Sequence, residues 1–279
     1  MAYTKEEFKQ LVDDIQSQSW YKNPIGFGIA KVDRGQINKD KILQATFPLI
    51  NWNENFGSAA VLLNALKVAG VDVDTSKSEL VAKISDEFLT SCIEAFRPFI
   101  PEAKGDAHKN VQVISTLASL PIDSGLSADD YRVVFIFEDV TPESTEAVYL
   151  KLYALSTGKA ALRSLNLTGA FGKLHNCAWV GNQPIELDWL RANEIVLKLS
   201  GKYPNIDMVD KFPRFLQHII PADNTRILET SKVRMGAQLA AGTTVMPGAA
   251  YVNFNAGTLG AVMVEGRISS SAVVGAGSD

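Results

Sequence analysis

Two charged residues, Glu265 and Arg267, lie two positions apart in the stretch "MVEGRIS" near the end of this 279-residue sequence. The tract around them, from Val233 to Asp279, is rich in Gly, Ala, Val, Ser and Thr and carries almost no other charge. A carboxylate can take a proton from an attacking nucleophile, and a guanidinium can bind two oxygens of a carboxylate or phosphate. The alternative interpretation is a solvated ion pair, because residues two apart on a strand share one face.

The tract that holds this pair has a six-residue period. Apolar residues recur at this interval, and glycines follow the same interval between them. The apolar positions are Ile227, Val233, Leu239, Val245 and Tyr251, then Val262, Ile268 and Val274, and the glycines are Gly236, Gly242 and Gly248. This period fits neither a helix nor a simple strand, but it is typical of a parallel β-helix with about 18 residues per coil. The apolar residues are then expected to fill its narrow core.

The period breaks between Tyr251 and Val262, which are eleven residues apart. We expect a bulge or protruding loop within "YVNFNAGTLGAVMVEGR", and such irregularities in a solenoid often carry the binding site. Asn253 and Asn255 alternate onto one face of this segment. They could either order the loop through side-chain turns or bind a carboxylate of a substrate.

The rest of the chain predicts an α/β region that positions this tract. Thr4 and Glu7 fit a capping box, Gly70 fits a helix stop, and Thr141 with Pro142 fits a helix start. Residues 100–130 are expected to be rich in loops. The expected helices cover residues 4–15, 55–70, 77–100, 143–159 and 187–202, and the expected strands cover residues 25–33, 131–140 and 175–188.

We therefore expect three parts. They are an N-terminal α/β region over residues 1–125, a second α/β region with a linker over 126–220, and the β-helix over 221–279. The last part counts only 53 residues from Ile227, about three coils, and it stops without a cap. The sequence thus predicts a β-helix that is incomplete at its C-terminal end.

Composition excludes several classes of function. Hydrophobic residues make up 46% and charged residues 21% of the chain, and the formal net charge is −4, so we expect no nucleic-acid or anionic-membrane partner. No apolar run approaches the ~20 residues that cross a bilayer, and the charged N-terminus is no signal peptide. Two cysteines, Cys92 and Cys177, cannot form a disulfide framework, so a cytoplasmic location is expected.

Other reactive side chains are expected to be structural. His108, His175 and His218 lack any metal-ligand spacing, and Cys177 is better explained as a buried structural thiol. The sequence contains no phosphate-binding glycine motif that opens a helix after a strand and no nucleophile elbow.

The C-terminal motifs resemble a known family. "VDKFP" at Val209–Pro213, "GTTVM", "VNFNAGTLG" and "MVEGRIS" are similar to the longer-chain branch of the tetrahydrodipicolinate N-succinyltransferases. The resemblance is strong over this part of the chain and weak before it. It implies a homotrimeric acyltransferase with a left-handed parallel β-helix, active sites between subunits and coenzyme A along the outside of the coil. Its members transfer succinyl from succinyl-CoA to the amino group of the tetrahydrodipicolinate-derived substrate, on the route to diaminopimelate and lysine.

The resemblance also implies roles for single residues. Glu265 falls on the acidic catalytic position, for which an acyl-anhydride intermediate is assigned, although general-base chemistry is equally open. Arg267 falls on a position that contacts succinyl-CoA. Longer-chain relatives can read "MHEG" where this sequence reads "MPGA", which places Ala249 and Lys232 where acidic metal ligands would stand. We expect no metal site of that type, no bound cofactor, and succinyl-CoA as co-substrate.

Two other functions stay open. One is another CoA-dependent N-acyltransferase of the hexapeptide class, acting on a different amine. The second is a non-catalytic trimerisation module, because the family continues past Asp279 into coils that supply much of the CoA site.

Overall fold

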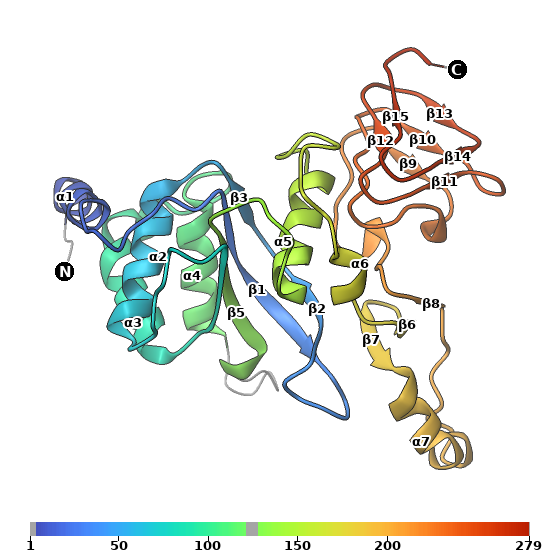
Figure 1. Ribbon diagram of the computed structural model, residues 1–279, viewed down its shortest axis with the longest axis horizontal. Helices are drawn as coiled ribbons and strands as arrows, with labels where there is room; N and C mark the ends of the chain where they lie inside the picture. The colour runs from blue at the N-terminus through green and yellow to red at the C-terminus, as the bar shows by residue number, and fades with distance from the viewer. Residues whose placement is uncertain (1–3, 121–127, 279) are drawn as a thin grey trace. The chain divides into compact units, whose positions relative to one another are not determined.

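The computed structural model describes residues 4–120 and 128–278, which separate into two compact units (Figure 1). The first unit comprises Met1–Val32 with Phe47–Val140, and the second comprises Asp33–Thr46 with Thr141–Asp279. The expected division into three parts stays a prediction, and its boundary at residue 125 lies outside the described residues. In the described part of the chain, no helix has the length and apolar character needed to cross a membrane.

The first unit is built on an antiparallel sheet. Its strands are β1 (Gly26–Arg34, whose last two residues belong to the second unit), β3 (Ile50–Trp52), β4 (Glu79–Lys83) and β5 (Tyr131–Ile136). Strand β5 lies between β1 and β4, with Phe135 opposite Phe27 on one side and Leu80 on the other. Strand β3 pairs with the start of β1, where Ile50 lies opposite Gly28.

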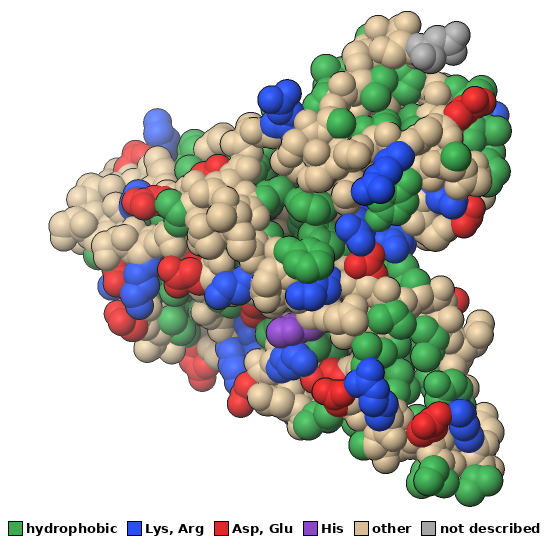
Figure 2. Space-filling model, turned by 45° about the vertical axis from the view of Figure 1, so that its right-hand side comes forward, with side chains coloured by type: hydrophobic (Ala, Val, Ile, Leu, Met, Phe, Trp, Pro, Cys, Tyr) green, Lys and Arg blue, Asp and Glu red, His purple; other side chains and the backbone are tan. Residues whose placement is uncertain are grey.

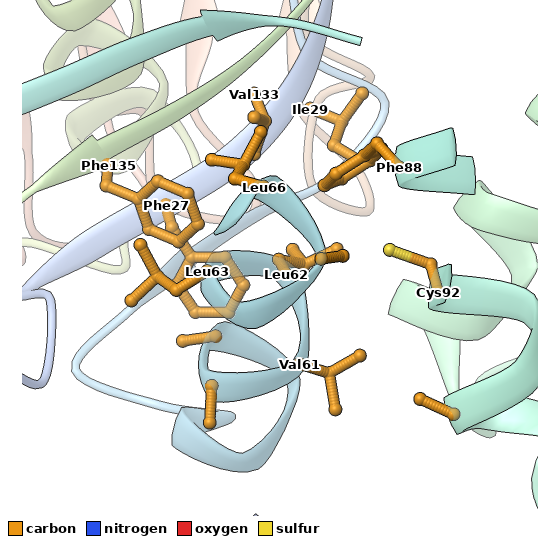
Figure 3. Packing of buried hydrophobic residues seen from close by; sticks show 14 of the residues in the cluster. Phe27, Ile29, Val61, Leu62, Leu63, Leu66, Phe88, Cys92, Val133 and Phe135 are labelled. Carbon is orange, nitrogen blue, oxygen red and sulfur yellow. The ribbon is translucent and has the colours of Figure 1, made fainter. Parts of the chain in front are cut away.

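Helices cover this sheet and supply most of its core (Figure 1). They are α1 (Lys5–Gln16), α2 (Phe56–Val68), α3 (Asp86–Phe96), η1 (Arg97–Glu102) and α4 (Lys109–Ser119), and the short η3 (Ala128–Asp130) precedes β5. Helix α2 is apolar along most of its length, and its Leu62, Leu63 and Leu66 lie in one cluster with Phe27 and Phe135 of the sheet (Figure 3). Burying this much apolar surface stabilises the unit.

Local signals predicted several element ends of this unit correctly. The Thr4 hydroxyl accepts a hydrogen bond from the Glu7 amide at 3.1 Å, and the Glu7 carboxylate accepts one from the Thr4 amide at 3.0 Å, as a capping box requires. Gly70 follows α2 with φ of +80°, a conformation that glycine adopts without strain.

The prediction of one helix over residues 77–100 is wrong. The first part of this segment is β4, and α3 begins only after Ser85, whose hydroxyl caps the Phe88 amide at 3.2 Å. Pairing with β5 satisfies the backbone of Leu80 and Val81, which outweighs the helical spacing of their side chains. The loop-rich prediction for 100–130 is also wrong over α4, while residues 121–127 lie outside the described part.

The second unit begins with β2 (Ile42–Thr46), against which α5 (Thr145–Ser156) packs. Ser144 caps α5 by accepting from the Ala147 amide at 3.0 Å, so the predicted start at Thr141 and Pro142 is three residues early. The predicted helix itself is confirmed. A short α6 (Ala170–Lys173) follows.

A small antiparallel sheet follows in the order β7-β6-β8. Its strands are β6 (Cys177–Val180), β7 (Gln183–Glu186) and β8 (Met208–Asp210), and α7 (Leu187–Leu199) is inserted between β7 and β8. The extended segment and the helix expected here are confirmed. Trp179 is fully buried and donates its indole N–H to the Asp210 carbonyl at 2.9 Å, which ties β6 to the end of β8.

A buried carboxylate anchors the excursion 33–46 within this unit. Glu186 accepts a hydrogen bond from the Ile37 amide at 2.8 Å and pairs with the Lys41 ammonium at 2.9 Å. The Glu186 amide donates to the Gln36 side chain at 2.8 Å. Charge-assisted hydrogen bonds to both oxygens of this carboxylate therefore fix the turn between β1 and β2.

The C-terminal tract winds into passes whose short strands pair in parallel (Figure 1). One face holds β9 (Arg226–Ile227), β10 (Thr244–Val245) and β13 (Met263–Val264). The second holds β11 (Tyr251–Val252) and β14 (Arg267–Ile268), and the third holds β12 (Gly257–Thr258) and β15 (Val273–Val274). The short η4 (Phe215–Gln217) and η5 (Thr230–Lys232) precede and join these passes.

Pairing between passes follows the six-residue period only in its regular part, because Ile227 and its partner Val245 are 18 residues apart but Val252 and its partner Ile268 are 16 apart. Each strand pairs with its counterpart one pass later, as Ile227 does with Val245 and Val252 with Ile268. Three strands, one on each face, therefore complete a pass, and the β-helix built from hexapeptides stays a prediction.

The inward position is shifted by one residue in the second pass. Val233 and Val245 are fully buried as the period predicts, but the next buried residue is Val252, and Tyr251 is only half-buried. The prediction that Tyr251 fills the core is therefore wrong. An extra residue before β11 changes the register, because Val233 pairs with Val252 rather than with Tyr251.

Candidate active site

Glu265 lies at an unusually short corner of the coil. Glu265 and Gly266 are the two residues between β13 and β14, whereas residues 246–250 form the corresponding corner of the preceding pass. The irregularity that the sequence predicted as a protruding loop is therefore a shortened turn at the end of that segment. The corner at Glu265 therefore projects less than the longer corner of the neighbouring pass.

The charged pair lines an open hollow of about 420 Å³ at this end of the coil. Glu265 and Arg267 are both exposed, and Val264, Ile268 and Val274 form the apolar part of the lining. Within residues 4–120 and 128–278, no ion pair joins Glu265 to Arg267. Both side chains are therefore available to a ligand in this arrangement.

Tyr251 lies directly beside this corner. It is the parallel partner of Arg267, and its amide donates to the Gly266 carbonyl at 3.2 Å. Since Val252 and Ile268 point into the core, Tyr251 and Arg267 lie on the outer side of the same wall. The backbone on which Arg267 sits is thus fixed by the preceding pass.

A cluster around Asp210 lies on this wall and was not found by sequence reasoning. Arg234 donates from Nε and Nη2 to the Asp210 carboxylate, with a shortest distance of 2.9 Å, and Arg214 donates to the same carboxylate at 2.9 Å. The Arg234 guanidinium also lies 5.3 Å from the Phe212 ring and 5.9 Å from the Tyr251 ring. The motif "VDKFP" holds Asp210 and Phe212, but Arg234 is distant in the sequence and only the fold brings it there.

Asn253 and Asn255 do not reach Glu265 through any contact among the described residues. The Asn253 amide oxygen accepts from Arg234 at 3.2 Å and from the Phe254 amide at 3.0 Å. Asn255 is buried at φ of +54°, and its oxygen accepts from the Arg163 amide at 2.8 Å. These contacts order the turn, and a role in ligand binding stays a prediction for both.

Comparison with known proteins places the chain in a family. The family model described as "Tetrahydrodipicolinate N-succinyltransferase N-terminal" matches residues 6–172, and the model of the middle part of the same enzyme matches residues 174–214. The chain belongs to the tetrahydrodipicolinate N-succinyltransferase family. These matches extend the resemblance to the N-terminal region, where the sequence motifs alone were weak.

Individual members of the tetrahydrodipicolinate N-succinyltransferase family match over almost the whole chain. A 2,3,4,5-tetrahydropyridine-2,6-dicarboxylate N-succinyltransferase of Sulfurovum is 67% identical over 98% of this chain and 68% of its own length. The enzyme of that name from Campylobacter jejuni is 57% identical over 100% of this chain and 70% of its own length. A crystal structure of a 2,3,4,5-tetrahydropyridine-2-carboxylate N-succinyltransferase from the same species has a TM-score of 0.94 at 57% identity, covering 100% of this chain and 71% of that one.

Both cysteines of this family member are buried and His175 and His218 are partly buried, whereas His108 is exposed. Burial lowers the pKa of His218 to about 3, and its Nδ1 lies 2.9 Å from the Tyr153 hydroxyl. Burial raises the pKa of Cys177 to about 11 and that of Cys92 still further. Thiols held protonated in this way are poor nucleophiles.

Lys232 lies near the position expected for an acidic metal ligand. Its ammonium donates to the Gly248 carbonyl at 2.7 Å and lies 3.6 Å from Glu229. Among the residues that the structure describes, no group of three or more His, Cys, Asp or Glu side chains could hold a metal ion. The absence of a metal in this family member stays a prediction.

Proposed function

We propose that this chain transfers a succinyl group from succinyl-CoA to the amino group of the tetrahydrodipicolinate-derived substrate, in diaminopimelate and lysine biosynthesis. The observation that carries the proposal is its likeness over almost its whole length to enzymes bearing that name. The exposed Glu265 and Arg267 at one hollow support it, because acyl transfer to an amine needs a proton acceptor and an anchor for an anionic donor.

Direct attack is the simpler route. The amine lone pair of the acceptor attacks the thioester carbonyl, the carbon–sulfur bond breaks, and coenzyme A leaves as the thiolate. Glu265 takes the proton that the amine nitrogen loses, and the thiolate acquires a proton on release. The Arg267 guanidinium would hold a carboxylate or phosphate of succinyl-CoA, so that the thioester stays within reach of the amine.

An acyl-anhydride on Glu265 is the second route. Here a carboxylate oxygen attacks the thioester first and expels coenzyme A. The amine then attacks the succinyl carbonyl of the anhydride, and the carboxylate that is released takes the proton that the nitrogen loses. Rapid mixing of the protein with succinyl-CoA alone separates the routes. A burst of one free thiol per active site indicates the anhydride, whereas direct attack gives no burst without acceptor.

We also propose a left-handed β-helix and a homotrimer for this chain. Parallel pairing between successive passes supports the coil, and two buried free thiols, Cys92 and Cys177, fit a cytoplasmic location. Sedimentation analysis of the purified protein tests the trimer. We further propose that no metal and no bound cofactor is needed, which activity after dialysis against a chelator tests.

A thiol-release assay tests the function. Purified protein is given succinyl-CoA or acetyl-CoA, each with and without the acceptor. Release that requires both succinyl-CoA and the acceptor supports the proposal. Release with a different amine or with acetyl-CoA points to another hexapeptide N-acyltransferase, and a trimer without any release points to a non-catalytic assembly module.

A further inference from the structure

A second guanidinium, that of Arg234, lies on the same outer wall as Arg267. The Arg234 amide donates to the Val252 carbonyl at 3.0 Å, so it lies one pass before Tyr251, and Arg267 lies one pass after it. Neighbouring strands are about 4.8 Å apart and residues along a strand about 3.3 Å apart, and Arg234 is level with Asn253, two residues beyond Tyr251, so the backbones of the two arginines lie about 12 Å apart. The two guanidinium groups can therefore contact two different substrates that lie side by side on this wall.

The surroundings of Arg234 carry surplus positive charge. Two guanidinium groups, those of Arg234 and Arg214, share the single carboxylate of Asp210. The Nε of Arg214 is buried and has no hydrogen-bond partner among the described residues, and Arg214 as a whole is only 9% exposed. A cluster with one more cation than anion and a donor left over favours binding of a further anion.

Arg234 is held as a binding residue would be held. Asp210 fixes the Nε and Nη2 edge of its guanidinium, and Asn253 accepts from Nη1 at 3.2 Å. Nη1 carries two N–H groups, so one of them stays available. The side chain is 21% exposed, and the Phe212 and Tyr251 rings restrict its plane, which reduces the entropy lost on binding.

We propose that Arg234 binds a carboxylate of the acceptor substrate, with Asp210 as its positioning residue and Tyr251 as the apolar surface between Arg234 and Arg267. This inference rests on the proposed function, since the acceptor named for the relatives is a ring dicarboxylate. Arg267 serves the succinyl-CoA side of the reaction, and Arg234 supplies the cation that the acceptor needs.

Calorimetric titration with pyridine-2,6-dicarboxylate, a planar unreactive ring dicarboxylate, tests this assignment. The double variant Asp210→Asn/Arg234→Gln removes both charges while keeping hydrogen-bonding groups of similar size, so that neither charge is left buried alone. We expect its affinity for the probe to fall about 10- to 100-fold, the effect of losing a charge-assisted hydrogen bond. Pyridine-2-carboxylate, with one carboxylate, should bind the wild-type protein more weakly and lose less.

Matched controls separate binding from structure. The variant Asp188→Asn/Arg191→Gln removes an exposed ion pair on α7 and should leave probe affinity unchanged. Arg234→Lys keeps the charge but not the fork, and an intermediate loss of about 10-fold is expected if the double variant fails to fold. Unchanged probe affinity in a folded Arg234 variant, or no binding of the probe to the wild-type protein, overturns the proposal.

Kinetics distinguish this proposal from the function on which it rests. In an active enzyme, the double variant should raise KM for the acceptor and leave KM for succinyl-CoA nearly unchanged. Turnover with an unchanged acceptor KM refutes the role of Arg234 and leaves the transferase function standing. If the wild-type protein has no turnover, the transferase function fails, while the calorimetric result still decides whether Arg234 binds dicarboxylates.

Discussion

Tyr251 and Arg267 are paired residues of adjacent parallel strands, and the Tyr251 amide bonds to the carbonyl of Gly266, immediately before Arg267. Glu265 therefore lies in the corner between β13 and β14, and pairing with β11 of the preceding pass fixes the position of β14. Charged groups on such a fixed backbone are pre-organised for binding and need little rearrangement. Basic and acidic side chains are interspersed over the face of the molecule shown in Figure 2.

Glu265→Gln tests the proton acceptor. We expect kcat to fall at least about 100-fold, because the amide cannot accept the proton of the amine, while KM for succinyl-CoA changes little. Since Glu265 is exposed, the oligomer and the melting temperature should not change. Glu229→Gln, which alters another exposed carboxylate on the coil, is the control. Equal activity of the two variants would show that Glu265 has no catalytic role.

Arg267→Gln should raise KM for succinyl-CoA about 10- to 100-fold and affect KM for the acceptor less. Arg267→Lys should recover part of this loss, because the charge returns without the second donor edge. Initial rates at varied concentrations of each substrate measure both constants. An effect confined to the acceptor KM would instead assign Arg267 to the other substrate.

Gly257→Ala should destabilise the coil by about 3 kcal/mol or more, because its Cβ would overlap the backbone carbonyl of Gln238 on the neighbouring pass. Gly248→Ala is the matched control. Gly248 has φ of +78° with open space around it, so the backbone strain alone should cost about 1 kcal/mol. Denaturant unfolding measures both changes, and similar losses in the two variants would contradict the close approach of the passes.

His218 should make the protein less stable in acid. Its folded-state pKa of about 3 lies below the ordinary value of about 6.5, so the unfolded chain binds a proton that the folded chain refuses. The contribution of neutral His218 is complete above pH 6.5 and is lost as pH falls toward 3, at about 1.4 kcal/mol per pH unit.

His218→Gln should remove this contribution to the slope of stability against pH, measured by denaturant unfolding between pH 4 and 7. The rings of Tyr149 and Tyr153 lie against His218, and burial raises the pKa of the Tyr149 hydroxyl well above its ordinary value. His108→Gln, at an exposed site of the first unit, is the control. An identical slope in wild type and His218→Gln would show that the folded protein admits the proton.

Local physics decides which elements the sequence could predict. The box formed by Thr4 and Glu7 and the buried run of β5 depend on neighbours within a few residues, so they were readable. Strand β4 could not be predicted in this way, because the backbone of Leu80 pairs with Phe135, which lies far ahead in the chain. The apolar residues from Leu80 to Phe96 have helical spacing, so the sequence favoured a helix over this strand. The shift of the inward position by one residue before Val252 could not be predicted for a related reason, because only the pairing between passes fixes the register.

The candidate site divides in the same way. Glu265 and Arg267 could be chosen because their charge stands out in a tract of small residues. The contacts of Arg234 with Asp210 and Tyr251 could not be predicted, since they join a sheet strand to two different passes of the coil. Asn255 was chosen for its polarity. In the structure its backbone is left-handed and its side chain is buried, so the turn requires this residue for its conformation, which sequence spacing does not reveal.

The anchoring of the excursion 33–46 by Glu186 constrains how this protein emerges from the ribosome. The partner of the Ile37 amide, the Glu186 carboxylate, is synthesised only after more than half the length of the chain has followed Ile37. At about 5–20 residues per second, translation takes about 7–30 s to supply it. For about the first two-thirds of this interval the antiparallel sheet of the first unit still lacks β5, and throughout it the turn after β1 lacks the Glu186 carboxylate. A chaperone that shields extended apolar segments would therefore find its target early, before the parallel coil has been made.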